Sequence, residues 1–123
     1  MSISSYLEPL LLDAVFNGGT VTVAATYVQI HIGDPGEDGT ANVAAETTRQ
    51  AASWAAAAGG TIQTDTDLNW GSVAATETYT HISVWDASSS GNHLWYGELL
   101  AAYDVNDGDD FILPAGTVTA TLT

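Results

Sequence analysis

The stretch TYTHISVWD, residues 78–86, is the strongest β-strand signal in this 123-residue chain. Its β-branched and aromatic side chains are the types that pack best on a pleated sheet. Side chains alternate along a strand, so Ile82 and Val84 are expected to share one face. Tyr79 and His81 are expected on the opposite face. The stretch therefore predicts a strand with one clearly apolar side.

Similar segments lie on both sides of this stretch, separated by turn signals. The segment TYVQIHI, residues 26–32, alternates in the same way and places His31 on its polar face. Clusters of Asp, Gly, Asn and Ser predict turns at 33–40, 88–92 and 104–110. Further strands are predicted at 20–24, 68–73, 93–100, 110–116 and 117–123.

The segment TTRQAASWAAAA, residues 47–58, is ambiguous, because its alanines favour a helix. The pair Gly59-Gly60 that follows is typical of a hairpin turn leading into the next segment, TIQT. This turn favours a strand. Strands at intervals of about 8–12 residues with no later helix predict a mainly β fold, an antiparallel β-sandwich or a barrel-like variant of it.

The N-terminal segment ISSYLEPLLLDAVF, residues 3–16, predicts one short α-helix. Ser4 or Ser5 can cap its start, and Pro9 fits if it lies in the first turn. Asn17-Gly18-Gly19 then ends the helix, because Gly and Asn accept the left-handed conformation of a C-terminal cap.

The length and composition suit one domain, residues 1–123, with the helix at 3–16 and the β-sandwich at 20–123. Four Trp and five Tyr accompany the acidic residues, so the chain has material for a core. The chain has no cysteine, which excludes disulfides and thiolate metal sites. No apolar run approaches the ~20 residues of a membrane span, and the N-terminus lacks the basic region of a signal peptide. We therefore expect a soluble protein without membrane insertion.

Charge is the strongest compositional signal, since fifteen Asp and Glu residues stand against one basic residue, Arg49. The formal net charge of −14 excludes a phosphate-binding face, and with it nucleic-acid partners. Such a charge makes a compact chain repel itself at low salt, but screening shortens to about 3 Å at 1 M salt. We expect a surface adapted to high salt. An ordinary acidic protein is the alternative.

The sequence contains no pattern that indicates catalysis. His31, His81 and His93 are too scattered for a metal motif, and His31 and His81 are expected on exposed faces of strands. The chain lacks a nucleophile elbow, a metalloprotease helix and a phosphate-binding loop. We expect no enzymatic activity, no catalytic or metal-binding residue and no cofactor.

The acidic turn at 104–110 matches a calcium-binding EF-hand loop only in part. Gly108 comes one residue too early, and Ala115 stands where the loop requires a glutamate. The simplest interpretation of this turn, and of 33–40, is a β-turn with solvated carboxylates. Weak cation binding by both turns is the alternative.

Large apolar side chains are the candidates for contacts with other proteins. Leu7, Leu10 and Leu11 fall on one stripe of the predicted helix. Trp70, Trp85 or Trp95 would suit a sugar-stacking platform, but large aromatics more often fill a core or a subunit interface. The predicted interface residues are Leu7, Leu10, Leu11, Trp85 and Trp95.

Taken in order, several blocks of the chain resemble small virion proteins of tailed viruses, described as tail-fibre-like or head-decoration-like. The clearest block is Thr80–Ala87, and the similarity extends over nearly the whole chain. The chain departs from the pattern in having no lysine, which suggests a halophile-adapted, haloarchaeal-virus-like member. The resemblance implies a structural role without catalysis. Its blocks are 16–20, 27–36, 48–51, 59–60, 70–73, 80–87, 91–97 and 105–116.

The first functional hypothesis is a structural component of a tailed-virus particle, an exposed capsid decoration or turret protein in a high-salt environment. The first alternative is a tail-fibre or baseplate adhesion module, and the second is a carbohydrate-binding module. The expected partners are the major capsid or tail proteins of the same virion, further copies of the chain and the host cell surface. The expected location is the outer surface of the virion, after synthesis in the host cytoplasm.

Overall fold

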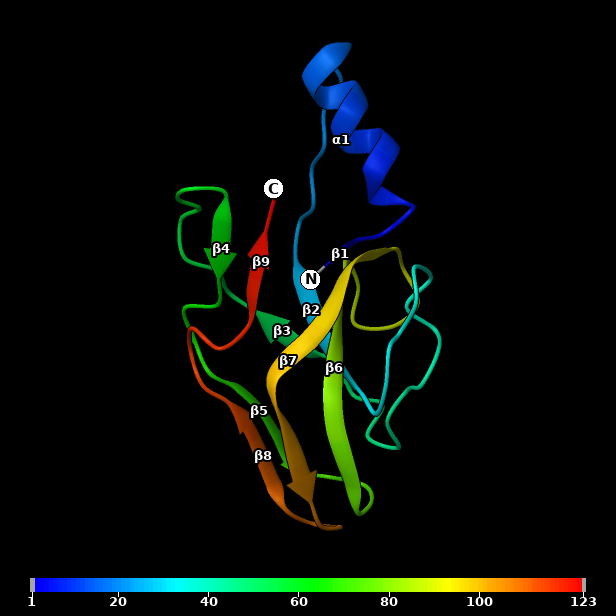
Figure 1. Ribbon diagram of the computed structural model, residues 1–123, viewed down its shortest axis with the longest axis vertical. Helices are drawn as coiled ribbons and strands as arrows, with labels where there is room; N and C mark the ends of the chain where they lie inside the picture. The colour runs from blue at the N-terminus through cyan, green and yellow to red at the C-terminus, as the bar shows by residue number, and fades with distance from the viewer. Residues whose placement is uncertain (1, 123) are drawn as a thin grey trace.

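The computed structural model describes residues 2–122 and shows antiparallel sheets with one short helix (Figure 1). The largest sheet has five strands in the order β1-β7-β6-β2-β3, and two two-stranded ribbons, β4-β9 and β5-β8, complete the fold. The mainly β prediction with a single short helix is thereby confirmed. The elements are β1 Ser2–Ile3, α1 Leu7–Phe16, β2 Thr26–His31, β3 Gln50–Ala52, β4 Thr61–Gln63, β5 Leu68–Ser72, β6 Glu77–Trp85, β7 His93–Val105, β8 Asp110–Leu113 and β9 Thr119–Thr121.

Strand β6, the segment with the strongest strand signal in the sequence, is the central strand of the large sheet. It pairs with β2 on one side and with β7 on the other, with Ile82 opposite Ile30 and Val84 opposite Val28. All four side chains are buried. Tyr79 departs from the predicted alternation, because it also belongs to this core. The register between β6 and β7 shifts between Tyr79 and His81, which breaks the strict two-residue period there.

The core lies between the large sheet and the β5-β8 ribbon. Trp70 of β5 and Phe111 of β8 have ring centroids 5.7 Å apart, and Tyr79 of β6 meets Phe111 edge-on at 4.9 Å. Trp70 also donates a hydrogen bond from its indole nitrogen to the carbonyl oxygen of Thr48, at 2.7 Å. These contacts join the two layers into the predicted sandwich.

The N-terminal region differs from its prediction in two respects. Residues 2–3 form β1, which pairs with Tyr96 and Trp95 of β7, so the helix begins at Leu7 rather than at residue 3. Residues 20–24, predicted as a strand, are irregular. They follow the helix back towards β2 (Figure 1). Their β-branched side chains favour a strand locally, but a strand also needs a partner, and the segment pairs with none of the described strands.

The hairpin predicted at Gly59-Gly60 is confirmed. The backbone N–H groups of Ala58 and Thr61 each donate to the other residue's carbonyl, at 2.9 and 3.1 Å. Both glycines have positive φ angles, 60° and 78°, as the tightest hairpin turn requires. Within the ambiguous segment 47–58, β3 and isolated bridges at Trp54 and Ala58 are extended. The alanine-rich segment is therefore not helical.

Tyr79 provides a test of this core, because its hydroxyl is buried without a hydrogen-bond partner among the described residues. Burial, with Glu77 nearby, raises the pKa of Tyr79 to about 12. Tyr79→Phe removes the unsatisfied hydroxyl, so it should raise the free energy of unfolding by about 1 kcal/mol. The wild type should lose stability between about pH 10 and 12, since the unfolded tyrosine ionises first.

The substitution should remove that alkaline loss, so the advantage of Tyr79→Phe should grow as the pH rises. Urea unfolding at pH 7 and 11 measures both effects. The exposed Tyr6→Phe serves as the control and should change little at neutral pH. A Tyr79→Phe variant less stable than wild type at both pH values would contradict this account of the core.

Candidate functional site

Large exposed apolar side chains gather at one end of the molecule's longest axis (Figure 1). The helix α1 and the segment that returns from it form a projecting arm, residues 5–25, at one end (Figure 1). Of the ten large apolar side chains that the structure exposes, seven lie on this arm or at its foot. Soluble proteins rarely leave that much apolar surface together without a partner. The seven are Tyr6, Leu10, Leu12, Val15, Phe16, Val23 and Leu122.

The helix is exposed because it lies beyond the sheets. Leu7 alone is buried on α1, while Leu12, Val15 and Phe16 are exposed by 59, 74 and 77%. The end of α1 is well formed, since the N–H groups of Asn17 and Gly19 both donate to the carbonyl of Asp13. The arm is thus an ordered helix with an apolar surface rather than an unfolded tail.

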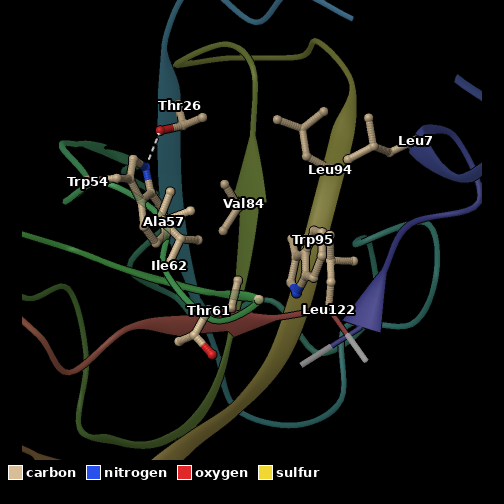
Figure 2. Close-up of a pocket in the computed structure, with 12 residues that line it drawn as sticks. Leu7, Thr26, Trp54, Ala57, Thr61, Ile62, Val84, Leu94, Trp95 and Leu122 are labelled. Atoms are coloured by element: carbon tan, nitrogen blue, oxygen red, sulfur yellow. Dashed lines mark hydrogen bonds between the residues drawn. The ribbon is translucent and has the colours of Figure 1, made fainter. Parts of the chain in front are cut away.

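An apolar groove of about 340 Å³ opens at the foot of the arm. Figure 2 shows side chains from α1, β2, β4, β6 and β7 converging on it. None of its lining residues carries a charge. Six of the side chains that form its walls are Leu7, Trp54, Ile62, Val84, Trp95 and Leu122.

A second cavity of about 330 Å³ adjoins the groove through Trp95 and Leu122. Its lining is more polar and includes Glu8 and Glu37. The apolar groove therefore ends at a rim of carboxylates on this side.

The predicted interface residues take different positions in the structure. Leu10 is exposed by 37% and Leu11 is half-buried, both on the arm. Leu7 is 8% exposed at the foot of α1, where it lines the groove. Trp95 is half-buried and lines both cavities. Four of the five residues thus lie at the apolar end.

Trp85, the fifth, is only 7% exposed and offers little surface to a partner. The guanidinium carbon of Arg49 lies 4.0 Å from the centre of its ring. Gly39 and His93 also lie against the Trp85 ring. A Cβ atom added at Gly39 would lie 2.8 Å from the Trp85 ring, and the φ of Gly39 is +72°. The loop after β2 can therefore pack this closely against Trp85 only with glycine at this position.

Arg49, the one basic residue, is used inside the fold. It donates hydrogen bonds to the side chain of Gln29 at 3.2 Å and to the carbonyls of Ala87 and Ser90 at 2.8 and 2.7 Å. All three acceptors are uncharged oxygens. Arg49 therefore fastens the turn after β6 to the sheet, and solvent cations must balance the carboxylates of the surface.

The tryptophans do not form a sugar-binding platform of the predicted kind. Trp70 and Trp85 are buried. Trp54 and Trp95 share the groove, and the indole nitrogen of Trp54 donates to the hydroxyl of Thr26 at 2.7 Å (Figure 2). The indole nitrogen of Trp95 is buried without a partner among the described residues. Sugar recognition needs hydrogen-bonding groups beside the aromatic rings, and the groove presents almost none.

Of the two acidic turns, 33–40 reaches the second cavity through Glu37, whereas 104–110 lies at the opposite end of the molecule (Figure 1). Figure 1 places the start of β6, the end of β7 and the start of β8 there, together with the turn between β7 and β8. Its carboxylates build local structure: Asp109 accepts from the backbone N–H of Asn106 at 2.8 Å, and Asp104 from the hydroxyl of Thr78 at 2.6 Å. Within residues 2–122 no group of three or more potential ligands is arranged to hold a metal ion. Five acidic residues mark this end, namely Glu77, Asp104, Asp107, Asp109 and Asp110.

The prediction that His31 is exposed is wrong. Its side chain is fully buried, with Nδ1 2.9 Å from the carbonyl of Ala41 and Nε2 2.7 Å from the hydroxyl of Ser83. A carbonyl only accepts, so Nδ1 carries the proton, and Ser83 donates to Nε2 while accepting from the indole of Trp85. Burial lowers the pKa of His31, which keeps the ring neutral.

This serine–histidine pair is closed to substrates, because both side chains are fully buried. The loop after β2 covers it, and the same loop is held by His93, whose Nδ1 lies 2.7 Å from the carbonyl of Glu37. Burial also lowers the pKa of His93. His81 is half-buried on β6, opposite His31. His31 and His93 thus serve the packing of this loop onto the sheet.

None of the described helices is long and apolar enough to cross a membrane.

Comparison with known proteins identifies the family. No curated protein matches the chain. One family model does, that of the podophage GP4 fiber I protein gp80, and it covers residues 2–121. The match includes the arm, both ribbons and every groove residue except Leu122, so it describes nearly the whole fold rather than a short motif. The chain therefore belongs to the podophage GP4 fiber I protein gp80 family, a family of tailed-virus structural proteins.

Proposed function

We propose that this protein is a fibre component of a tailed-virus particle and contacts other virion subunits through its apolar end. The polarity of the molecule supports this more than any other observation. An exposed helix and an apolar groove occupy one end, and five acidic residues mark the other. A subunit of a fibre needs such a division, because one surface must bind neighbours while the rest stays in water.

The family favours a fibre over the capsid decoration that the sequence first suggests. The proposed partners are tail proteins of the same particle and further copies of the chain, on the outer surface of the virion. We propose that the assembled fibre, rather than this chain alone, contacts the host cell surface. The proposed role is structural, because the His31–Ser83 pair is sealed from solvent and the groove presents almost no polar groups of the kind that a catalytic or sugar-binding site uses.

The copy number per particle tests this proposal. Purified particles should contain a handful to a few tens of copies, measured by quantitative mass spectrometry against the major capsid protein. Fibres attach at the few symmetry-related positions of one tail, whereas decorations follow the capsid lattice. Hundreds of copies per particle would overturn the fibre proposal in favour of decoration, and absence of the chain from particles would overturn the structural role altogether.

A further inference from the structure

We propose that the groove at the foot of the arm receives the tip of the arm of a second copy of this chain. The tip is the last turn of α1, where Val15 and Phe16 are the most exposed apolar side chains of the arm. The inference rests on the proposed fibre function, in which copies of the chain lie next to one another in the particle. Its test uses the purified protein alone, so its failure is distinct from a wrong copy number in particles.

The chemistry of the two surfaces matches. The groove walls are almost entirely apolar and carry no charge, and the arm tip presents a branched and an aromatic side chain. Moving both surfaces out of water is favourable in proportion to the apolar area removed. A polar ligand would lose its hydration in this groove and gain few hydrogen bonds in return.

The extent of the apolar surface also fits a second copy. Seven side chains exposed by 37–77% present on the order of 400 Å², if a fully exposed Val, Leu or Phe side chain offers roughly 100 Å² of apolar surface. An apolar patch of this size on a monomer often marks a functional surface. A stable interface takes about 800 Å² from each partner, so the walls of the groove and its polar rim must supply the rest of the area.

The geometry makes this surface self-complementary. Leu7 at the foot of α1 is itself a wall of the groove, so arm and groove are continuous within one molecule. In a two-fold pair the same patch serves both partners, each arm covering the other copy's groove. The tip lies at the far end of the helix whose first residue lines the groove, so two arms packed antiparallel would each bring a tip to the other copy's groove.

Electrostatics favours this end for a contact between like-charged copies. Each copy carries a net charge of −14, so two copies repel wherever carboxylates meet. Contact through the arms places the acidic ends of the two molecules, marked by Glu77 and Asp110, farthest apart (Figure 1). Glu8 and Asp13 remain on the arm, so association should strengthen with salt.

The oligomeric state of the purified protein is the first test. Sedimentation equilibrium in about 1 M NaCl should show a dimer or a larger assembly at micromolar concentration. Phe16→Ser should raise the dissociation constant at least about tenfold, because it removes the apolar tip. The control is Leu100→Ser, at an 80% exposed leucine on β7 outside the groove, which should leave association unchanged. A monomer under these conditions would overturn the proposal and assign the groove to a different protein.

Cross-linking between single-cysteine variants gives the second test, because the natural chain has no cysteine. A tagged Asn17→Cys variant keeps Val15 and Phe16 and places the thiol beside the tip. Mixed with an untagged Ala57→Cys variant, it should form a mixed disulfide dimer on oxidation, since Ala57 lines the groove. The mixture of Asn17→Cys with Leu100→Cys should form far less. Circular dichroism confirms that each variant is folded. Cross-links only between two Asn17→Cys chains would show helix-to-helix contact and would overturn docking in the groove.

Discussion

Arg49→Ala should lower the free energy of unfolding by about 2–4 kcal/mol, a large effect for a half-buried residue near the surface. The guanidinium makes three hydrogen bonds, two of them to carbonyls of the turn after β6, and stacks on Trp85. Alanine would leave those oxygens without their donor and would expose the indole face. Urea denaturation with fluorescence detection measures the change, and the emission of the uncovered Trp85 should move to longer wavelength.

Arg49→Lys is the matched variant, because it keeps the only positive charge. Lysine cannot reproduce a planar group that reaches Gln29, Ala87 and Ser90 together. The lysine variant should therefore lose more than half of the stability that alanine loses. If Arg49→Lys were as stable as the wild type, the contribution of Arg49 would be its charge alone, and the account of the turn would be wrong.

Salt should stabilise the protein strongly. Between 0.1 and 1 M NaCl the screening length falls from about 10 to about 3 Å, so repulsion among the carboxylates weakens. We expect the melting temperature to rise by at least about 5 °C, equivalent to roughly 1 kcal/mol for a domain of this size. Arg49 is the only Lys or Arg residue in the chain, and its hydrogen bonds go to uncharged oxygens. Dissolved cations must therefore reduce the repulsion among the surface carboxylates. Differential scanning calorimetry over a salt series measures the shift.

A charge-reduced variant separates general screening from the binding of a particular cation. Asp107→Asn with Asp110→Asn changes two exposed carboxylates at the acidic end. This double variant should be more stable than wild type at low salt and less sensitive to added salt. NaCl and KCl should act alike. A melting temperature that does not depend on salt would contradict adaptation to high salt, and a rise with only one cation would indicate a specific binding site instead.

Local sequence signals predicted the central strands well. Strand β6 lies within one residue of its predicted limits at each end, and the turn at Gly59-Gly60 has the predicted conformation. In both cases the determining information is contained in a few neighbouring residues. The segment 20–24 shows where this fails, since its composition favours a strand but no partner lies beside it.

The site was harder to predict, because its parts meet only through long-range packing. His31 has the position of a solvent-facing residue within its own strand, yet a loop ten residues later covers it. Leu7 and Trp95 were predicted as interface residues from their size and apolarity, but the groove that joins them to Trp54 and Ile62 depends on how β4 and β9 lie beside the large sheet. The exposure of Phe16 likewise follows from the projection of the whole helix, which no periodicity within it reveals.

Cryo-electron microscopy of intact particles at high salt tests the central claim most directly, by locating this chain and its orientation. We predict density in the tail fibres, with the arm and the groove enclosed by neighbouring subunits and with the acidic end of β6, β7 and β8 facing solvent. Density on the capsid lattice, or a chain attached through its acidic end with the arm free in solvent, would contradict it.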